Sequence, residues 1–166
     1  MTFDSRERPS RIPWPPLIGA GALMAATACA FAFPVSLPFA PLARPLGSAL
    51  IAAGVALVAW AVATLRRART TTLPHRGADR LVASGPFAVS RNPIYLGVAI
   101  AFVGLGGAVD SPWFVVAAFI EAALIDVFGV RREEAHLASR FGEEWAAYAA
   151  RVPRWLGVPG KPPGAS

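Results

Sequence analysis

Charged residues are scarce in this chain of 166 residues. They make up 16% of it, against roughly 25% in ordinary soluble domains, and 55% of the residues are hydrophobic. The hydrophobic residues gather in long runs, which the surface of a soluble globular protein would not contain. The composition therefore indicates an integral membrane protein.

Cysteine and histidine are nearly absent as well. Cys29 is the single cysteine, which excludes an internal disulfide and a CxxC pair for redox or metal chemistry. His75 and His136 are the only histidines, too few for a zinc site unless carboxylates join them, so we predict no metal. The glycine cluster at 104–107 lacks the Lys-Ser/Thr of a phosphate-binding loop, and we assign it to helix packing.

Four apolar intervals predict membrane-spanning helices, because about 20 apolar residues cross a hydrocarbon core about 30 Å thick. Prolines between residues 34 and 45 predict an extended loop after the first span. Asn92 and Pro93 predict the start of the third, as N-cap and first helical residue. We expect an all-α membrane protein with one domain over residues 1–166. Its spans lie at about 15–33, 47–65, 93–108 and 112–130, with a cytoplasmic loop at 66–92 and a cytoplasmic C-terminal amphipathic helix at 131–150.

Small residues recur in the second and third spans. Gly54 in one and Gly97 and Gly104 in the other are typical of helices whose backbones approach closely in lipid, where packing drives association. We expect helix backbones to approach closely at these faces.

The basic residues give the orientation. Of 16 Lys and Arg residues, only Arg44 lies in a predicted outer connection, and basic residues are retained on the cytoplasmic side. Both termini are thus predicted to be cytoplasmic. This placement explains the net charge of +6 without a nucleic-acid partner. The strong preference for arginine over lysine favours a GC-rich bacterial gene and so a bacterial inner membrane.

The predicted cytoplasmic parts hold most of the polar chemistry. The loop at 66–92 is too long for a simple turn, and long ordered loops in small proteins are often functional. Four apolar residues at helical spacing follow the fourth span, and this stripe either lies on the membrane or closes over the loop. They are Leu137, Phe141, Trp145 and Tyr148. Glu133 and Glu134 precede the stripe and are the carboxylates best placed for a cation.

Two motifs in these parts carry a resemblance. The first is GPFAVSRNPIYLG at 85–97, and the second is EEAHLASRFGEEWAAY at 133–148, followed by VPR at 152–154. Together, over about 64–156, they resemble the isoprenylcysteine carboxyl methyltransferase family, and phospholipid N-methyltransferases share parts of the pattern. The resemblance implies an integral-membrane methyltransferase that uses S-adenosyl-L-methionine, bound between the loop and the C-terminal helix. A lipophilic or lipid-linked acceptor would enter from the bilayer.

The resemblance also implies site residues. Those expected to bind the cofactor are Leu81, Val82, Phe87, Arg91, Asn92, Pro93, Ile94, Tyr95 and Glu133. Arg131 and Glu134 are expected to be catalytic. A carboxylate acceptor needs no general base, whereas an amine or thiol acceptor needs one, for which His75, His136 and Glu134 are the candidates.

The chain departs from the family pattern at four positions. Asn92 stands where many members have histidine, Phe87 where they have tyrosine, and Ala88 where they have a basic residue. Gly129 replaces an arginine that faces the substrate in relatives acting on prenylated proteins, and leaves Arg131 or Arg132 as substitutes. The acceptor therefore stays open between a carboxylate, a thiol and an amine.

Each feature also has a structural alternative. Arg91 and Arg131 can anchor helix ends at headgroups, and Glu133 and Glu134 can form a solvated face. Glu121 is costly inside a bilayer and hints at a polar cavity, as does Asp126 unless the span ends before it. The competing function is a non-enzymatic membrane protein, such as a scaffold or transporter subunit.

Overall fold

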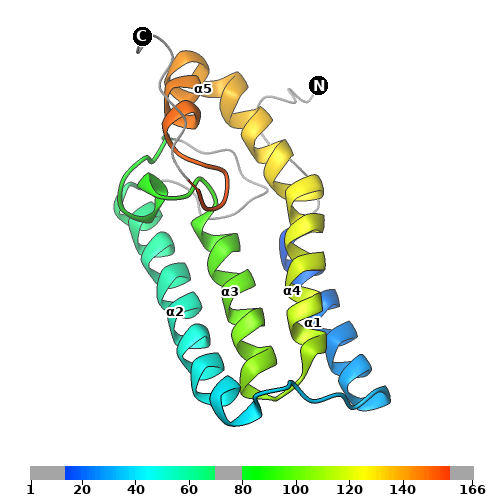
Figure 1. Ribbon diagram of the computed structural model, residues 1–166. Helices are drawn as coiled ribbons and strands as arrows, with labels where there is room; N and C mark the ends of the chain where they lie inside the picture. Colours follow the sequence, from blue (N-terminus) through cyan, green and yellow to red (C-terminus); the bar gives the residue numbers. More distant parts are fainter. Residues whose placement is uncertain (1–13, 70–79, 158–166) are drawn as a thin grey trace.

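The computed structural model describes residues 14–69 and 80–157, and every regular element in them is helical. The all-α prediction is confirmed. Four helices lie side by side and a fifth closes one end of the bundle (Figure 1). The elements are α1 (Trp14–Ala32), α2 (Ala40–Arg67), a 3₁₀ turn η1 (Gly85–Ala88), α3 (Pro93–Ala108), α4 (Pro112–Ile125), a π turn η2 (Asp126–Val130) and α5 (Arg131–Arg151).

Three of the described helical stretches are long and apolar enough to cross a membrane. They are α1, the part of α2 from Pro41, and the continuous helix Pro112–Arg151 formed by α4, η2 and α5. The last has 40 residues, about twice the number that a hydrocarbon core requires, and it bends at Gly142. Only its apolar first half is needed to cross, so α5 extends beyond the bilayer. The protein is an integral membrane protein.

The small residues of α2 and α3 let the two helices touch along their backbones. A Cβ added to Gly97 would lie 2.7 Å from the carbonyl oxygen of Gly54, and one added to Gly104 would lie 2.7 Å from that of Gly47. Both distances are too short for real atoms, so glycine is required at these crossing points. The close backbone approach predicted at these small residues is confirmed, and the structure shows that it occurs between α2 and α3.

The extended loop predicted between residues 34 and 45 is wrong for its second half. Helix α2 already begins at Ala40 and contains Pro41 and Pro45. Pro41 lies in the first turn, where its missing N–H leaves no intrahelical bond unmade. Pro45 removes one bond near the helix start, and the backbone N–H groups of Leu42 and Ala43 still donate to Phe39 O.

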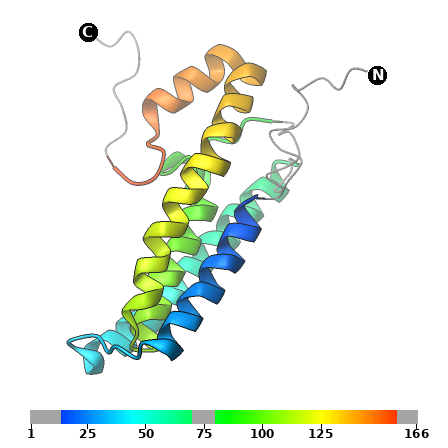
Figure 2. The ribbon, with the colours of Figure 1, turned by 90° about the vertical axis from the view of Figure 1, so that its right-hand side faces the viewer.

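Helix α5 bends at Gly142, whose φ of 50° and ψ of −118° are not helical. The bend turns the last part of the chain back over the bundle (Figures 1 and 2). The apolar stripe of α5 then packs against the chain entering η1. Trp145, Tyr148 and Val152 form its buried centre, with Leu81, Leu137 and Phe141 around them. Of the two predicted destinations for the stripe, the structure therefore has it closing over the loop.

Candidate functional site

The segment before α3 is an ordered turn. Gly85 has a φ of +60°, and Gly85–Ala88 form the 3₁₀ turn η1. A Cβ on Gly85 would come within 3.1 Å of the Thr64 hydroxyl, so the turn packs tightly on α2. Ser84, Gly85 and Pro86 are residue types typical of turns, and the turn at this point places the residues up to Asn92 at one end of the bundle.

A short C-terminal strap, Val152–Trp155, runs alongside this segment. The backbone N–H of Arg91 donates to Pro153 O at 2.9 Å, and the Ser90 hydroxyl donates to Arg154 O at 3.3 Å. The Asn92 side chain donates to the same carbonyl at 3.1 Å. Asn92 does stand just before α3, but its side chain makes no capping bond, and its Nδ2 donates to the strap.

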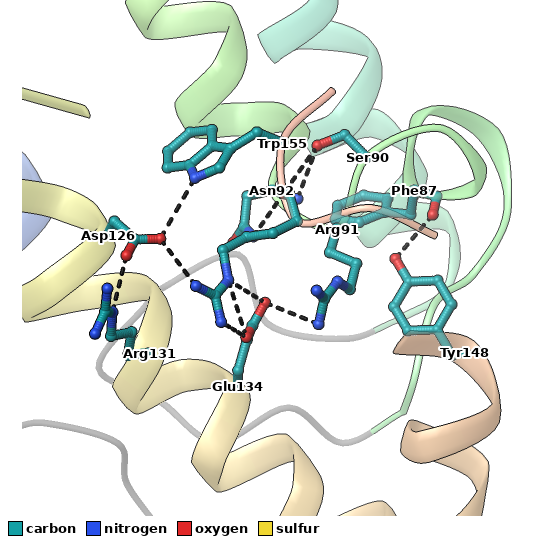
Figure 3. Close-up of polar contacts among 10 residues, drawn as sticks. Phe87, Ser90, Arg91, Asn92, Asp126, Arg131, Glu134, Tyr148 and Trp155 are labelled. Atoms are coloured by element: carbon teal, nitrogen blue, oxygen red, sulfur yellow. Dashed lines mark hydrogen bonds and ion pairs between the residues drawn. The ribbon is translucent and has the colours of Figure 1, made fainter. Parts of the chain in front are cut away.

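Glu134 lies at the centre of a charged network that ties the strap and the loop to α5 (Figure 3). Arg154 donates from Nη2 to Glu134 Oε2 at 2.7 Å, and from Nε to both carboxylate oxygens at 3.2 Å. Arg91 Nη1 reaches Glu134 Oε1 at 3.0 Å. The Glu134 side chain is only 12% exposed and that of Arg91 15%. Because these ion pairs are shielded from solvent, they hold the Arg91 side chain in one orientation.

The π turn η2 adds Asp126 to the network. Asp126 accepts bonds from Arg131 Nε at 2.9 Å, Arg154 Nη1 at 3.4 Å and Trp155 Nε1 at 3.4 Å (Figure 3). Such π turns are frequent at functional sites. Asp126, Arg154 and Trp155 were not predicted as site residues. The one signal in the sequence was the cost of a carboxylate near the end of a span.

Aromatic rings of α5 lie beside Arg91. The Arg91 guanidinium lies 5.7 Å from the centre of the Trp145 ring, which meets the Tyr148 ring edge-on at 5.6 Å. The Tyr148 hydroxyl donates to Phe87 O at 2.8 Å, and burial raises the pKa of this phenol. Loop, strap and α5 therefore meet around Arg91.

Glu133 lies in a different environment from Glu134. It accepts a long bond of 3.4 Å from the Tyr95 hydroxyl, and within the described residues no arginine pairs with it. Burial raises the pKa of Glu133 to about 7, the Tyr95 bond opposes this, and the negative charge of Glu134 adds to it. At the same end of the bundle, Arg91 Nε is buried and has no hydrogen-bond partner in the described chain. A half-buried carboxyl with one long hydrogen bond and a buried guanidinium N–H thus both have unused bonding capacity.

The predicted site residues are distributed as follows. Leu81, Phe87, Arg91, Asn92 and Glu134 meet through the contacts above, and Tyr95 joins Glu133. Pro93 is fully buried, whereas Val82 and Ile94 are half-buried.

The remaining candidates make no direct hydrogen bond or ion pair with these residues in the described contacts. The Arg131 side chain is 62% exposed and pairs with Asp126 rather than with Glu134. His136 is buried, its Nε2 has no described partner, and burial with the nearby charge of Arg140 lowers its pKa. His75 lies outside the described residues. Among those residues no three His, Cys, Asp or Glu side chains are grouped as metal ligands.

Comparison with known proteins places this chain in a family. The family model for phospholipid methyltransferases matches residues 42–144, more than half of the chain. The chain belongs to the phospholipid methyltransferase family. The matched region contains η1, α3, α4, η2 and most of α2 and α5, and so most of the network around Arg91.

Two curated relatives of this family member are metal-resistance proteins. The nickel-cobalt-cadmium resistance protein NccN of Alcaligenes xylosoxydans xylosoxydans is 34% identical over 82 residues, covering 49% of this chain and 38% of that protein. The cobalt-zinc-cadmium resistance protein CzcN of Cupriavidus metallidurans is 33% identical over 81 residues, covering 49% of this chain and 37% of its own length. The match thus spans less than two-fifths of these relatives. No solved structure matches the chain.

Proposed function

We propose that the protein is an S-adenosyl-L-methionine-dependent methyltransferase that modifies a lipophilic or lipid-linked acceptor. Family membership and the membrane-spanning helices support the reaction class and a lipid-like acceptor. The observation that carries the proposal is the buried Arg91 Nε, which has no partner among the described residues, together with the half-buried Glu133 carboxyl, which has one long hydrogen bond, at the same end of the helical bundle.

The residues fit the cofactor's chemistry. Its amino-acid end has a carboxylate and an ammonium, which suit Arg91 and Glu133 respectively. Its adenine suits apolar and aromatic side chains, for which Leu81, Val82, Phe87, Pro93, Ile94 and Tyr95 remain our candidates, with Asn92 beside them. When bound, the cofactor supplies an electrophilic methyl group on a sulfonium. The protein's own contribution is to hold the acceptor in line with that methyl group.

Glu134 and Arg131 have supporting roles in this proposal. Glu134 fixes the direction of Arg91 and Arg154, so it is a positioning residue for the cofactor end of the site. Arg131 is exposed and lies on the same network through Asp126, where it suits an anionic headgroup or an acceptor carboxylate at the membrane surface. The finer resemblance to isoprenylcysteine carboxyl methyltransferases supports this role for Arg131.

Calorimetry on the purified protein in detergent micelles tests the proposal. We expect S-adenosyl-L-methionine to bind, and Glu133→Ala and Arg91→Ala to weaken binding at least about tenfold, the loss of one charge-assisted bond. Glu143→Ala is the matched control, because Glu143 is an exposed acid on the same helix. Folded wild-type protein that binds no cofactor would overturn the enzyme assignment in favour of a scaffold or transporter subunit.

A further inference from the structure

Arg154 joins parts of the site that are far apart in the sequence, and it does so in two ways. Its backbone carbonyl accepts bonds from the Ser90 hydroxyl at 3.3 Å and from the Asn92 side-chain amide at 3.1 Å. Its guanidinium donates to Glu134 on α5 and to Asp126 in η2. The carbonyl bonds use the backbone alone, so they hold the strap on the loop whatever the side chain is. The guanidinium therefore has a separate role, which its charge defines.

The described charged network contains one more arginine than carboxylate. Its members are Arg91, Arg131 and Arg154 together with Asp126 and Glu134. The shortest ion pair of Asp126 is with Arg131 at 2.9 Å, and that of Glu134 is with Arg154 at 2.7 Å. Each carboxylate thus has an arginine of its own. Arg91 is the arginine whose charge these contacts leave in excess.

Arg91 and Arg154 share the Glu134 carboxylate, but they do not hold it equally. Arg154 uses two nitrogens, with Nε at 3.2 Å from both oxygens and Nη2 at 2.7 Å from Oε2. Arg91 reaches Oε1 through Nη1 at 3.0 Å, while its buried Nε has no partner among the described residues. Two-point pairs between arginine and carboxylate are the stronger kind. Arg154 therefore neutralises most of the Glu134 charge, and Arg91 keeps a positive charge and an unused N–H.

We propose that Arg154 is a positioning residue for the cofactor: it neutralises Glu134, so that the charge of Arg91 stays available for the cofactor's carboxylate. This inference rests on the proposed function and adds a residue to it. Without the Arg154 guanidinium, Glu134 would pair with Arg91 alone. A ligand carboxylate would then meet an arginine that is already neutralised and a second carboxylate, and like charges repel strongly where solvent is excluded. Arg154 acts through Glu134 and Arg91.

Decarboxylated S-adenosyl-L-methionine tests this role, because it has the adenine, the sulfonium and the ammonium of the cofactor and lacks only the carboxylate. Calorimetry on the full chain in detergent micelles gives a Kd for each ligand. The carboxylate preference is the Kd of the decarboxylated ligand divided by that of S-adenosyl-L-methionine. It should be about tenfold or more in the wild type and fall to about one in Arg154→Gln. The affinity of Arg154→Gln for the decarboxylated ligand should stay within about twofold of wild type.

Two further variants serve as controls. Arg151→Gln makes the same substitution at an exposed arginine of α5, whose Nε donates to the backbone carbonyl of Ala147, and should keep the wild-type preference. Arg154→Lys keeps the positive charge without the two-point pair, so it should keep most of the preference. A merely structural role for Arg154 predicts that Arg154→Gln weakens both ligands equally. That result would overturn the proposal.

A double variant separates charge from packing. Glu134→Gln combined with Arg154→Gln removes both members of the ion pair, so Arg91 again has a charge that no carboxylate beside it neutralises. The double variant should recover about threefold or more of the lost preference, whereas two independent packing defects would add. Recovery stays below wild type because Glu134 no longer orients Arg91. This variant leaves neither charge of the pair without its partner, so it also decides the question if Arg154→Gln alone does not fold. A double variant without carboxylate preference would contradict the charge argument.

The same titrations separate this inference from the proposed function. Folded wild-type protein that binds neither ligand would refute the methyltransferase assignment, and the role of Arg154 with it. Wild-type protein that binds both ligands equally well, or an Arg154→Gln variant that keeps the full carboxylate preference, would refute the role of Arg154 and leave cofactor binding intact.

Discussion

Glu133 and Glu134 are adjacent in the sequence and have different surroundings in the fold. Successive helical residues point about 100° apart, so one carboxylate turns toward Tyr95 inside the bundle and the other toward the strap. Glu134 is held by Arg91 and Arg154, whereas Glu133 has only one long hydrogen bond among the described residues. The sequence singled out both carboxylates for a cation. The contacts separate a positioning residue from a candidate ligand.

The raised pKa of Glu133 predicts how cofactor binding depends on pH. With a pKa of about 7, this carboxyl is mostly neutral at pH 6 and mostly charged at pH 8 in the empty protein. A cationic ligand prefers the charged form, so affinity should rise with pH, by about tenfold between these values. Calorimetry at several pH values checks this.

The affinities of the wild type and of Glu133→Gln are compared at each pH. The titration of the ligand itself affects both proteins equally, so it cancels in their ratio. The ratio of wild-type to variant affinity should grow as the pH rises through 7, because only the wild type gains a charge there. A ratio that is constant from pH 6 to 8 would contradict a role for Glu133 in holding the cation.

At the scale of elements, the parts that sequence patterns could predict are those governed by local chemistry. Hydropathy predicted the all-α class, and the position of proline predicted the helix start at Pro93. Asp126 and Arg154 were missed because their roles depend on a π turn and on a strap 28 residues later in the chain. No local pattern encodes that pairing.

The bend in α5 is the element on which the site depends most. Gly142 has a backbone conformation that side chains strain to adopt, and a Cβ there would meet nothing within 4 Å. Gly142→Ala therefore tests the backbone alone. We expect a loss of about 1–3 kcal/mol in the free energy of unfolding. Cofactor binding should weaken too, because the bend brings Trp145 and Tyr148 over the loop.

Gly21→Ala is the matched control for this substitution. Gly21 lies in α1, its added Cβ would also meet nothing within 4 Å, and its backbone is helical. Alanine there should be neutral or slightly stabilising. Thermal or denaturant unfolding in micelles measures both variants. If Gly142→Ala unfolds like Gly21→Ala and binds cofactor normally, the bend does not control the site.

At the scale of the whole molecule, the two ends of the bundle differ in charge. The end that carries α5 also holds the last turn of α2, with Arg66 and Arg67, and the segment before α3, with Arg91, whereas the first turns of α2, with Arg44, lie at the opposite end (Figure 1). The contacts at that opposite end involve neutral groups and one acidic side chain. Leu37 N–H donates to Asp110 at 2.9 Å, and Trp113 Nε1 donates to Phe33 O at 2.8 Å. The asymmetry supports an orientation with the α5 end, and the proposed site, in the cytoplasm.

Cysteine labelling tests this orientation in bacterial membranes. Cys29→Ser removes the one native thiol, after which Ser36→Cys marks the exposed α1–α2 connection and Ala138→Cys an exposed position on α5. A membrane-impermeant maleimide should label the first variant in intact spheroplasts and the second only in inverted vesicles. The reversed pattern would place the site outside the cytoplasm, away from the cell's S-adenosyl-L-methionine, and would count against the methyltransferase proposal as a whole.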